Sequence, residues 1–168
     1  MKETAQQYIR RIRGYVSGKD PVRVLAATPG RIGKLVRRLP SRRLKRRPAP
    51  GKWSIAEILA HLAEAELVGG YRIRTILGAP GAPIQAFDQD DWAKAGRYRE
   101  RDARKSLEMY CVLRENNLAL LRSLTPRQWK QYGMHQERGK ESVARIAEMF
   151  AGHDLNHLGQ IERLAGGK

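Results

Sequence analysis

Two histidines near the end of the sequence have a spacing that suits metal binding. His153 and His157 stand four residues apart within the segment 142–164, where apolar residues recur with the period of a helix. Side chains four residues apart lie one above the other on one face of a helix. Both imidazoles could therefore bind one ion, because neutral imidazole is a common ligand of divalent transition metals.

A third imidazole is available from a helix predicted far upstream. His61 lies one turn after Glu57, near the apolar face of a helix predicted over 54–77. The facing sides of bundle helices can share a metal ion, so His61 could join His153 and His157. Three protein ligands leave a coordination position open for water or a substrate, which is typical of a reactive site.

The spacing alone leaves a second interpretation open. His61 would then be a core histidine with satisfied hydrogen bonds, and the pair formed by His153 and His157 would lie on the polar edge of its helix. The fourth histidine, His135, falls in a predicted loop. Nothing in its position along the chain requires that it join the site.

The order His153-Asp154-x-x-His157 is similar to the His-Glu-x-x-His motif of zinc peptidases, with aspartate at the position of the general base. Many such peptidases take a third ligand from downstream. Only eleven residues follow His157, and they contain no histidine and a single carboxylate, Glu162. A peptidase is therefore not expected. On a helix Asp154 points about 100° away from His153, so we expect it to support the ligands or the fold.

A further set of polar side chains is predicted to support the ligands without binding the metal. Gln160 follows His157 by three residues and returns to the same face of the helix. Glu57 and Glu64 flank His61 on its own face. Hydrogen bonds from such groups orient imidazole ligands and make them more basic. The predicted supporting residues are Gln160, Asp154, Glu57 and Glu64.

The composition indicates one globular domain. The chain has 168 residues, of which 41% are hydrophobic and 30% charged. No apolar run approaches the roughly 18 residues of a membrane span, and the charged start of the chain lacks the apolar core of a secretory signal. The single cysteine, Cys111, excludes an internal disulfide, and its apolar neighbours indicate a core thiol. We expect a cytoplasmic protein without a membrane partner.

The positive charge is concentrated in the first part of the chain. The formal net charge is +16, and residues 1–47 hold 15 Lys and Arg against 2 Asp and Glu. Such a balance allows a nucleic-acid partner through this basic segment. An ordinary solvated basic face is favoured, because aromatic residues are sparse there and no DNA-binding motif can be placed.

The helical pattern predicts an all-α four-helix bundle. Ser54 and Glu57 form a capping box, and Thr28-Pro29 marks a helix start. The basic, proline-containing segment 41–50 is predicted to be a loop, and no strand pattern is found. The predicted helices cover 3–16, 21–27, 31–39, 54–77, 102–124 and 142–164, with helical turns at 88–95 and 126–129. Four of them, near 29–39, 54–77, 102–124 and 142–164, form the predicted bundle.

Together these motifs resemble the DinB-like (DinB/YfiT) superfamily of metal-binding four-helix bundles. The matching stretches are 47–62, which contains Trp-Ser-x-x-Glu-x-x-x-His, together with 133–139 and 152–161, which contains His-x-x-x-His. The overall likeness runs from about residue 21 to residue 164. The pairing of the two histidine motifs makes the resemblance specific, since either motif alone is common.

The resemblance implies the architecture and the metal ligands. The helices would run up-down-down-up, with residues 21–168 forming the bundle. Residues 1–20 lie outside the resemblance, and their own pattern predicts an extra basic N-terminal helix, packed on the core or extending from it. The family is often homodimeric, and its sites hold zinc, nickel or similar divalent ions. Its metal triad carries over to His61, His153 and His157.

The activity that the resemblance implies is less specific. Some relatives are S-transferases that use a low-molecular-weight thiol as co-substrate, and others are described as metal-dependent hydrolases. We therefore expect a small electrophilic molecule as substrate. The alternative is a non-catalytic stress-response or nucleic-acid-associated protein, in which the metal site is structural.

Overall fold

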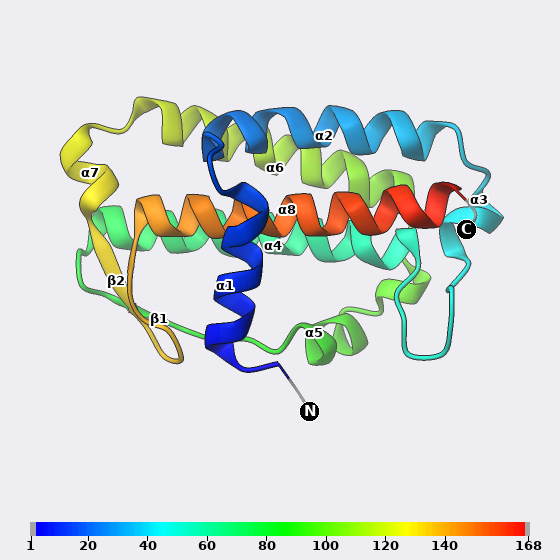
Figure 1. Cartoon of the computed structure of the whole chain (residues 1–168), viewed down its shortest axis with the longest axis horizontal. Helices are drawn as coiled ribbons and strands as arrows, with labels where there is room; N and C mark the ends of the chain where they lie inside the picture. Colours follow the sequence, from blue (N-terminus) through cyan, green and yellow to red (C-terminus); the bar gives the residue numbers. More distant parts are fainter. Residues whose placement is uncertain (1–2, 167–168) are drawn as a thin grey trace.

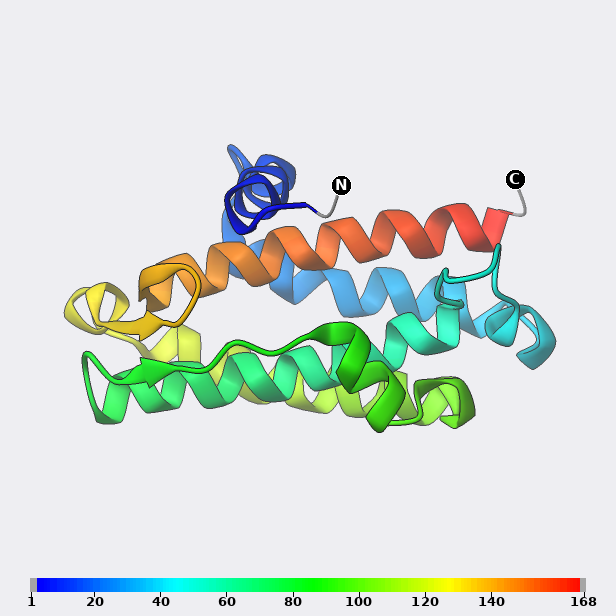
Figure 2. The same cartoon turned by 90° about the horizontal axis from the view of Figure 1, so that it is seen from below.

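Four long helices form the bundle in the computed structural model, which describes residues 3–166. Helices α2 and α8 run in one direction and α4 and α6 in the other, so the bundle is up-down-down-up (Figures 1 and 2). α2 packs against α6, and α8 packs against α4. The parallel helices α2 and α8 also pack against each other, as do α4 and α6. The predicted fold is confirmed. The four helices are α2 (Pro21–Arg37), α4 (Ile55–Gly78), α6 (Ala103–Ser123) and α8 (Val143–Gly166).

Side-chain caps fix the starts of the bundle helices. The predicted capping box is present at α4, where Ser54 and Glu57 each accept a backbone N–H of the other. Asp102 accepts the N–H groups of residues 104 and 105 at α6. At α2, Asp20 caps the helix and Pro21 occupies the first turn, where its missing N–H costs nothing.

Helix α2 is continuous where two helices were predicted. The sequence signals at Thr28 and Pro29 indicated a break between 21–27 and 31–39, but α2 passes through Pro29 without one. Proline leaves the carbonyl four residues earlier without its helical donor. That carbonyl belongs to Leu25, and it accepts a hydrogen bond of 2.8 Å from Nη1 of Arg114 on α6. A tertiary contact thus compensates for the lost helical bond.

Short elements close the ends of the bundle, and two of them differ from the predictions. The segment predicted as a basic loop begins with a short helix, α3 (Ser41–Lys45), anchored by the buried Leu44. A three-stranded sheet of order β1-β2-β3 was not predicted, because strands of two to four residues are too short for a period to show. Its strands are β1 (Pro83–Ile84), β2 (Tyr132–His135) and β3 (Gly139–Ser142), with β1 parallel and β3 antiparallel to β2.

The N-terminal helix α1 (Ala5–Val16) lies across α8 (Figures 1 and 2). The buried Ile12 holds it there. The two backbones approach so closely that a Cβ added at Gly152 would lie 2.1 Å from the carbonyl oxygen of Ile12. Only glycine fits at this crossing, and the crossing point is the residue before His153. α1 is therefore positioned to form a wall beside the predicted ligands.

The connection between α4 and α6 also lies on the bundle. It contains α5 (Gln89–Ala95), which covers the predicted helical turn, and a 3-10 turn at Tyr98–Glu100. Tyr98 is buried against α4, where its hydroxyl donates to Glu64 at 2.6 Å. The short helix α7 (Pro126–Lys130) precedes β2. Within residues 3–166 no helix is long and apolar enough to cross a membrane.

A layer of buried charge divides the core into two apolar halves. Arg114, Glu66 and Asp154 are each no more than 4% exposed. Along α4, α6 and α8 they fall between the apolar residues of one cluster and those of the other. One cluster includes Ile32, Val36, Ile58, Leu62, Tyr110, Leu158 and Ile161, and the other includes Leu25, Ile73, Ile76, Leu118, Leu121, Val143 and Ile146.

Candidate metal centre

The three predicted imidazoles lie together between α4 and α8. Nε2 of His153 lies 2.8 Å from Nε2 of His61 and 3.1 Å from Nε2 of His157. One ligand atom from each residue falls within 4.8 Å of the others. His153 and His157 occupy successive turns of α8, and the antiparallel packing of α4 brings in His61 from 92 positions upstream. The bundle thus assembles a cluster that the sequence only suggested.

The surroundings keep all three imidazoles neutral at pH 7. Burial is the main cause, and it lowers the pKa of His61 and of His153 well below 6.5. The neighbouring imidazoles lower these two pKa values further, because a second positive charge would be repelled. The pKa of His157 falls to about 4, again chiefly through burial. Neutral imidazoles offer the lone pairs that a metal ion needs.

The donor set fits a divalent transition metal. Nitrogen ligands of a tetrahedral zinc ion lie about 3.3 Å apart when each zinc–nitrogen bond is about 2.0–2.1 Å. The separations of 2.8 and 3.1 Å therefore need to widen by only a few tenths of an ångström. Imidazole nitrogens suit zinc, nickel, copper and iron alike, so the ligands themselves do not select one ion.

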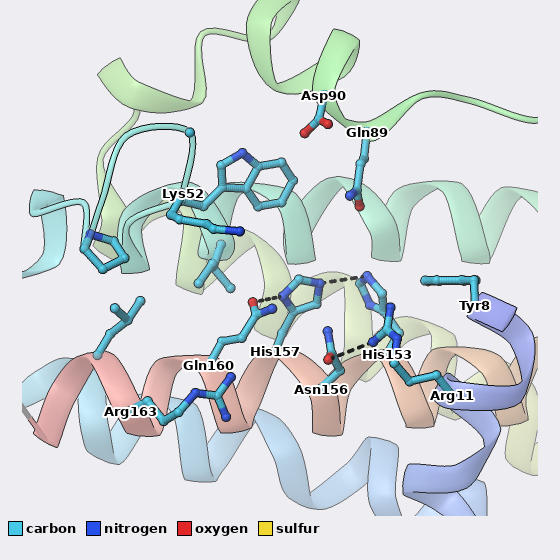
Figure 3. A pocket seen from close by; sticks show the side chains of 15 residues that line it. Tyr8, Arg11, Lys52, Gln89, Asp90, His153, Asn156, His157, Gln160 and Arg163 are labelled. Atoms are coloured by element: carbon cyan, nitrogen blue, oxygen red, sulfur yellow. Dashed lines mark hydrogen bonds between the residues drawn. The ribbon is translucent and has the colours of Figure 1, made fainter. Parts of the chain in front are cut away.

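Gln160 orients one of the ligands. Its carbonyl Oε1 lies 2.9 Å from Nδ1 of His157 and accepts the proton there (Figure 3). With the proton at Nδ1, the lone pair of Nε2 is directed toward the other two imidazoles. Gln160 is one helical turn beyond His157, which is the placement predicted from the sequence.

We expect the Gln160→Leu variant to bind zinc about 10- to 100-fold more weakly than the wild type, the usual cost of removing a group that orients a histidine ligand. Competition against a chromogenic chelator measures the affinity. Gln160→Glu keeps an acceptor at this position and should retain most of it, while Glu162→Gln, exposed on the same helix, serves as a control. Equal zinc affinity in Gln160→Leu and the wild type would show that the hydrogen bond from His157 to Gln160 does not contribute to zinc binding.

Asp154 does not support the imidazoles, although it lies between two of them in the sequence. Its carboxylate points to α6, where Oδ2 accepts hydrogen bonds from the Tyr110 hydroxyl at 3.0 Å and from Nη1 of Arg114 at 2.6 Å. The cause is the rotation of about 100° per residue, which directs Asp154 into the core while its neighbours face α4. Its role is to pair the buried Arg114.

Glu57 and Glu64 likewise bind groups other than His61. Glu57 completes the capping box of α4 and pairs with Arg47. Glu64 accepts the Tyr98 hydroxyl and pairs with Arg101 at 2.6 Å. Each carboxylate is therefore held by a basic residue of an adjacent connection, and neither has a hydrogen bond to an imidazole among residues 3–166. The predicted support of His61 by these two residues is not what the structure shows.

The remaining predicted candidates lie outside the cluster. His135 is buried in β2 rather than in a loop, and its Nδ1 accepts the backbone N–H of Glu137 at 3.1 Å. Burial and the nearby Arg138 lower its pKa to about 4. Cys111 packs against the core, and burial raises the pKa of its thiol. A thiol with a raised pKa is a poor nucleophile, as the sequence indicated.

A cleft of about 590 Å³ opens over His153 and His157 (Figure 3). This volume is typical of a site for a small molecule. One wall is α8, and the others come from α1, from the loop before α4 and from the start of α5. The ring of Trp53 in that loop packs 5.0 Å from the ring of His61.

Sequence reasoning missed most of the residues that line the cleft. Asn156 and Arg163 could have been found, because they fall on the helix face of His153 and His157. Tyr8 and Arg11 could not, because no local pattern shows that α1 crosses α8 beside the ligands. Further missed lining residues are Lys52, Trp53, Gln89 and Asp90.

The four-helix bundle brings three neutral imidazoles from two antiparallel helices together beside an open cleft, which His153 and His157 line, and this donor set suits a divalent metal. Residues 25–161 match the model of the DinB superfamily, and the chain belongs to this superfamily. The match begins inside α2, so α1 and the two cleft residues that it supplies lie outside the family model.

Individual relatives agree with this assignment. The chain is 29% identical over 132 residues to a protein of Oceanobacillus iheyensis, covering 79% of this chain and 76% of that one. It is 23% identical over 146 residues to YfiT of Bacillus subtilis, covering 86% and 82%. Both relatives carry provisional names as metal-dependent hydrolases.

A solved structure shares the fold. The structure of Bacillus subtilis YfiT is described as that of a probable metal-dependent hydrolase with an unusual four-helix bundle topology. It superposes with a TM-score of 0.80 at 20% identity, covering 98% of this chain and 89% of that one. At this identity the likeness establishes the fold alone.

Proposed function

We propose that this protein is a metal-dependent enzyme that acts on a small electrophilic molecule. His61, His153 and His157 would hold a divalent ion, with zinc or nickel as the expected metals. Such an ion lowers the pKa of a bound water or low-molecular-weight thiol, which supplies a nucleophile at neutral pH. The single observation that carries the proposal is that three neutral imidazoles meet beneath an open cleft.

The chain's own residues account for binding and orientation around that site. Gln160 keeps the proton at Nδ1 of His157, so its Nε2 remains available as a ligand. The ring of Trp53 packs on the ring of His61. The layer of charge around Arg114 fixes the face that α8 presents to α4. A purely structural metal would not need a cleft of this size over two of its ligands.

A nucleic-acid-associated function receives less support. Several basic residues of 1–47 are engaged within the protein, which reduces the charge available to a polyanion. Arg13 pairs with Glu148 at 2.9 Å, and Arg31 pairs with Glu162 at 3.0 Å. Arg43 donates to the carbonyl groups at the end of α8.

The test is an activity screen on protein purified without a metal-affinity tag and loaded with zinc or nickel. Activated esters, amides and epoxides are offered with and without low-molecular-weight thiols such as cysteine. Product formation that requires the thiol supports a transferase, and product formation without it supports a hydrolase. The metal-free protein and the His153→Ala variant should both be inactive. If fully loaded protein turns over none of these electrophiles, or if the metal-free protein is equally active, the proposal fails.

A further inference from the structure

Two basic side chains in the cleft have no partner in the described part of the chain. Lys52 lies in the loop before α4, and Arg163 lies in the last turns of α8. Neither side chain forms a hydrogen bond, an ion pair or a ring contact with residues 3–166. Figure 3 shows them on opposite walls of the cleft, on the Gln160 side of the imidazoles.

The third basic residue of the cleft is already occupied. Nε and Nη2 of Arg11 each donate to the carboxylate of Glu3 at 2.8 Å, and Nη1 donates to Asn156 at 3.2 Å. Arg11 therefore binds a carboxylate that the chain itself supplies. For Lys52 and Arg163 residues 3–166 supply none, since Asp90 is the one carboxylate of these residues that lines the cleft, and it pairs with neither.

The charge balance of the cleft favours an anion. Imidazole ligands carry no negative charge, so a divalent ion held by the three histidines would keep its full charge. Lys52 and Arg163 add two more positive charges at the rim, and Asp90 removes one. Like charges gathered in a concave site attract an anionic ligand and raise its local concentration. Guanidinium and ammonium groups are the side chains that bind carboxylate and phosphate.

We infer that Lys52 and Arg163 bind an anionic group, a carboxylate or a phosphate, on the molecule that occupies the metal centre. This inference rests on the proposed function and narrows its substrate class to acids. The reactive end of the ligand reaches the three imidazoles, and its acidic end lies toward Gln160. The charge could belong to the electrophile or to a thiol co-substrate, because both would enter by the same cleft.

The alternative is that Arg163 only stabilises helix α8. A cation in the last turn of a helix interacts favourably with the helix dipole. In that case its removal would lower the melting temperature slightly and leave ligand selection unchanged. Lys52 lies in a loop and cannot stabilise α8 in this way. Loss of ligand preference on removing both side chains would therefore indicate anion binding and not helix stabilisation.

The test uses the 168-residue chain loaded with cobalt, whose absorption spectrum reports on ligands that reach the metal. Two series of metal-binding probes are titrated. One consists of mercapto acids with one to five methylene groups, each matched to the mercapto alcohol of the same length. The other compares succinic acid monohydroxamate with acetohydroxamate. The range of lengths tests a series of separations between the metal and the two cations.

We expect the acidic probes of suitable length to bind about tenfold more tightly than their neutral matches, as two partly exposed charge-assisted contacts would give. The variant Lys52→Gln/Arg163→Gln should lose this preference and keep its affinity for the neutral probes. Lys34→Gln/Arg122→Gln, which removes the same charges from exposed positions outside the cleft, should behave as the wild type. Preference in one series alone would indicate which kind of molecule carries the acid.

Four outcomes would overturn the inference. The wild type would show no preference for an acidic probe at any length, or the double variant would retain the preference. In either case cobalt still binds, and the proposed function stands without the acid-binding site. If cobalt fails to bind, or if no probe perturbs its spectrum, the proposed function fails and the inference fails with it.

Discussion

The His153→Ala variant should lose stoichiometric binding of divalent transition metals. Nε2 of His153 lies 2.8 Å from that of His61 and 3.1 Å from that of His157, so its removal leaves only two imidazoles for an ion. We expect the affinity for zinc to fall by more than about 100-fold, since losing a group that merely orients a ligand costs 10- to 100-fold. His61→Ala and His157→Ala should behave alike.

Elemental analysis after gel filtration measures the bound metal, and thermal unfolding with and without a chelator measures its effect on stability. Wild type should melt at a lower temperature once the chelator removes the ion, because an ion that binds only the folded state stabilises it. His153→Ala should show no such shift. His135→Ala is the matched control, since His135 is a buried histidine outside the cluster. A His153→Ala protein that retains one metal per chain would refute the assignment of the site.

The Arg114→Met variant should be strongly destabilised. Arg114 pairs with Asp154 at 2.6 Å and with Glu66 at 2.7 Å, and all three side chains are buried. Methionine has a similar length but no charge, so it would leave two carboxylates buried without a cation. Breaking a buried ion pair in this way costs about 3–5 kcal/mol. The carbonyl of Leu25, which Pro29 leaves without a helical donor, would lose its partner as well.

Urea unfolding gives the free energy of unfolding of each variant. Arg122→Met, an exposed substitution on the same helix, should change it by no more than about 0.5 kcal/mol. Arg114→Met combined with Asp154→Leu and Glu66→Leu should recover part of the loss, because the unpaired charges are then absent. A loss of less than about 1 kcal/mol in Arg114→Met would mean that the charged layer does not hold the helices in register.

The sequence by itself determined the helices and the identity of the imidazoles. Helical periodicity, the capping box of Ser54 and Glu57 and the spacing of His153 and His157 are local properties of the chain. These patterns depend only on residues close together in the sequence, so they could be recognised without the structure. The motifs shared with the DinB superfamily supplied the third ligand, His61.

Only the tertiary structure decided which groups meet across the bundle. Arg114 reaches the carbonyl of Leu25 from 89 positions away, which is why α2 continues through Pro29. The helical rotation turns Asp154 away from the imidazoles, and the fold places Arg114 there to pair with it. Arg47 and Arg101 likewise pair with Glu57 and Glu64, which do not bond to His61. A charged side chain selects its partner by distance in the folded protein, and spacing along the chain does not report that distance.

Tertiary packing also decided which residues form the walls of the cleft. α1 crosses α8 because Gly152 has no side chain to hold the two backbones apart, and Lys52 reaches the cleft from a loop. The sequence therefore determined which residues could bind a metal. Tertiary packing decided which of them meet, what surrounds them and which charges a ligand would encounter there.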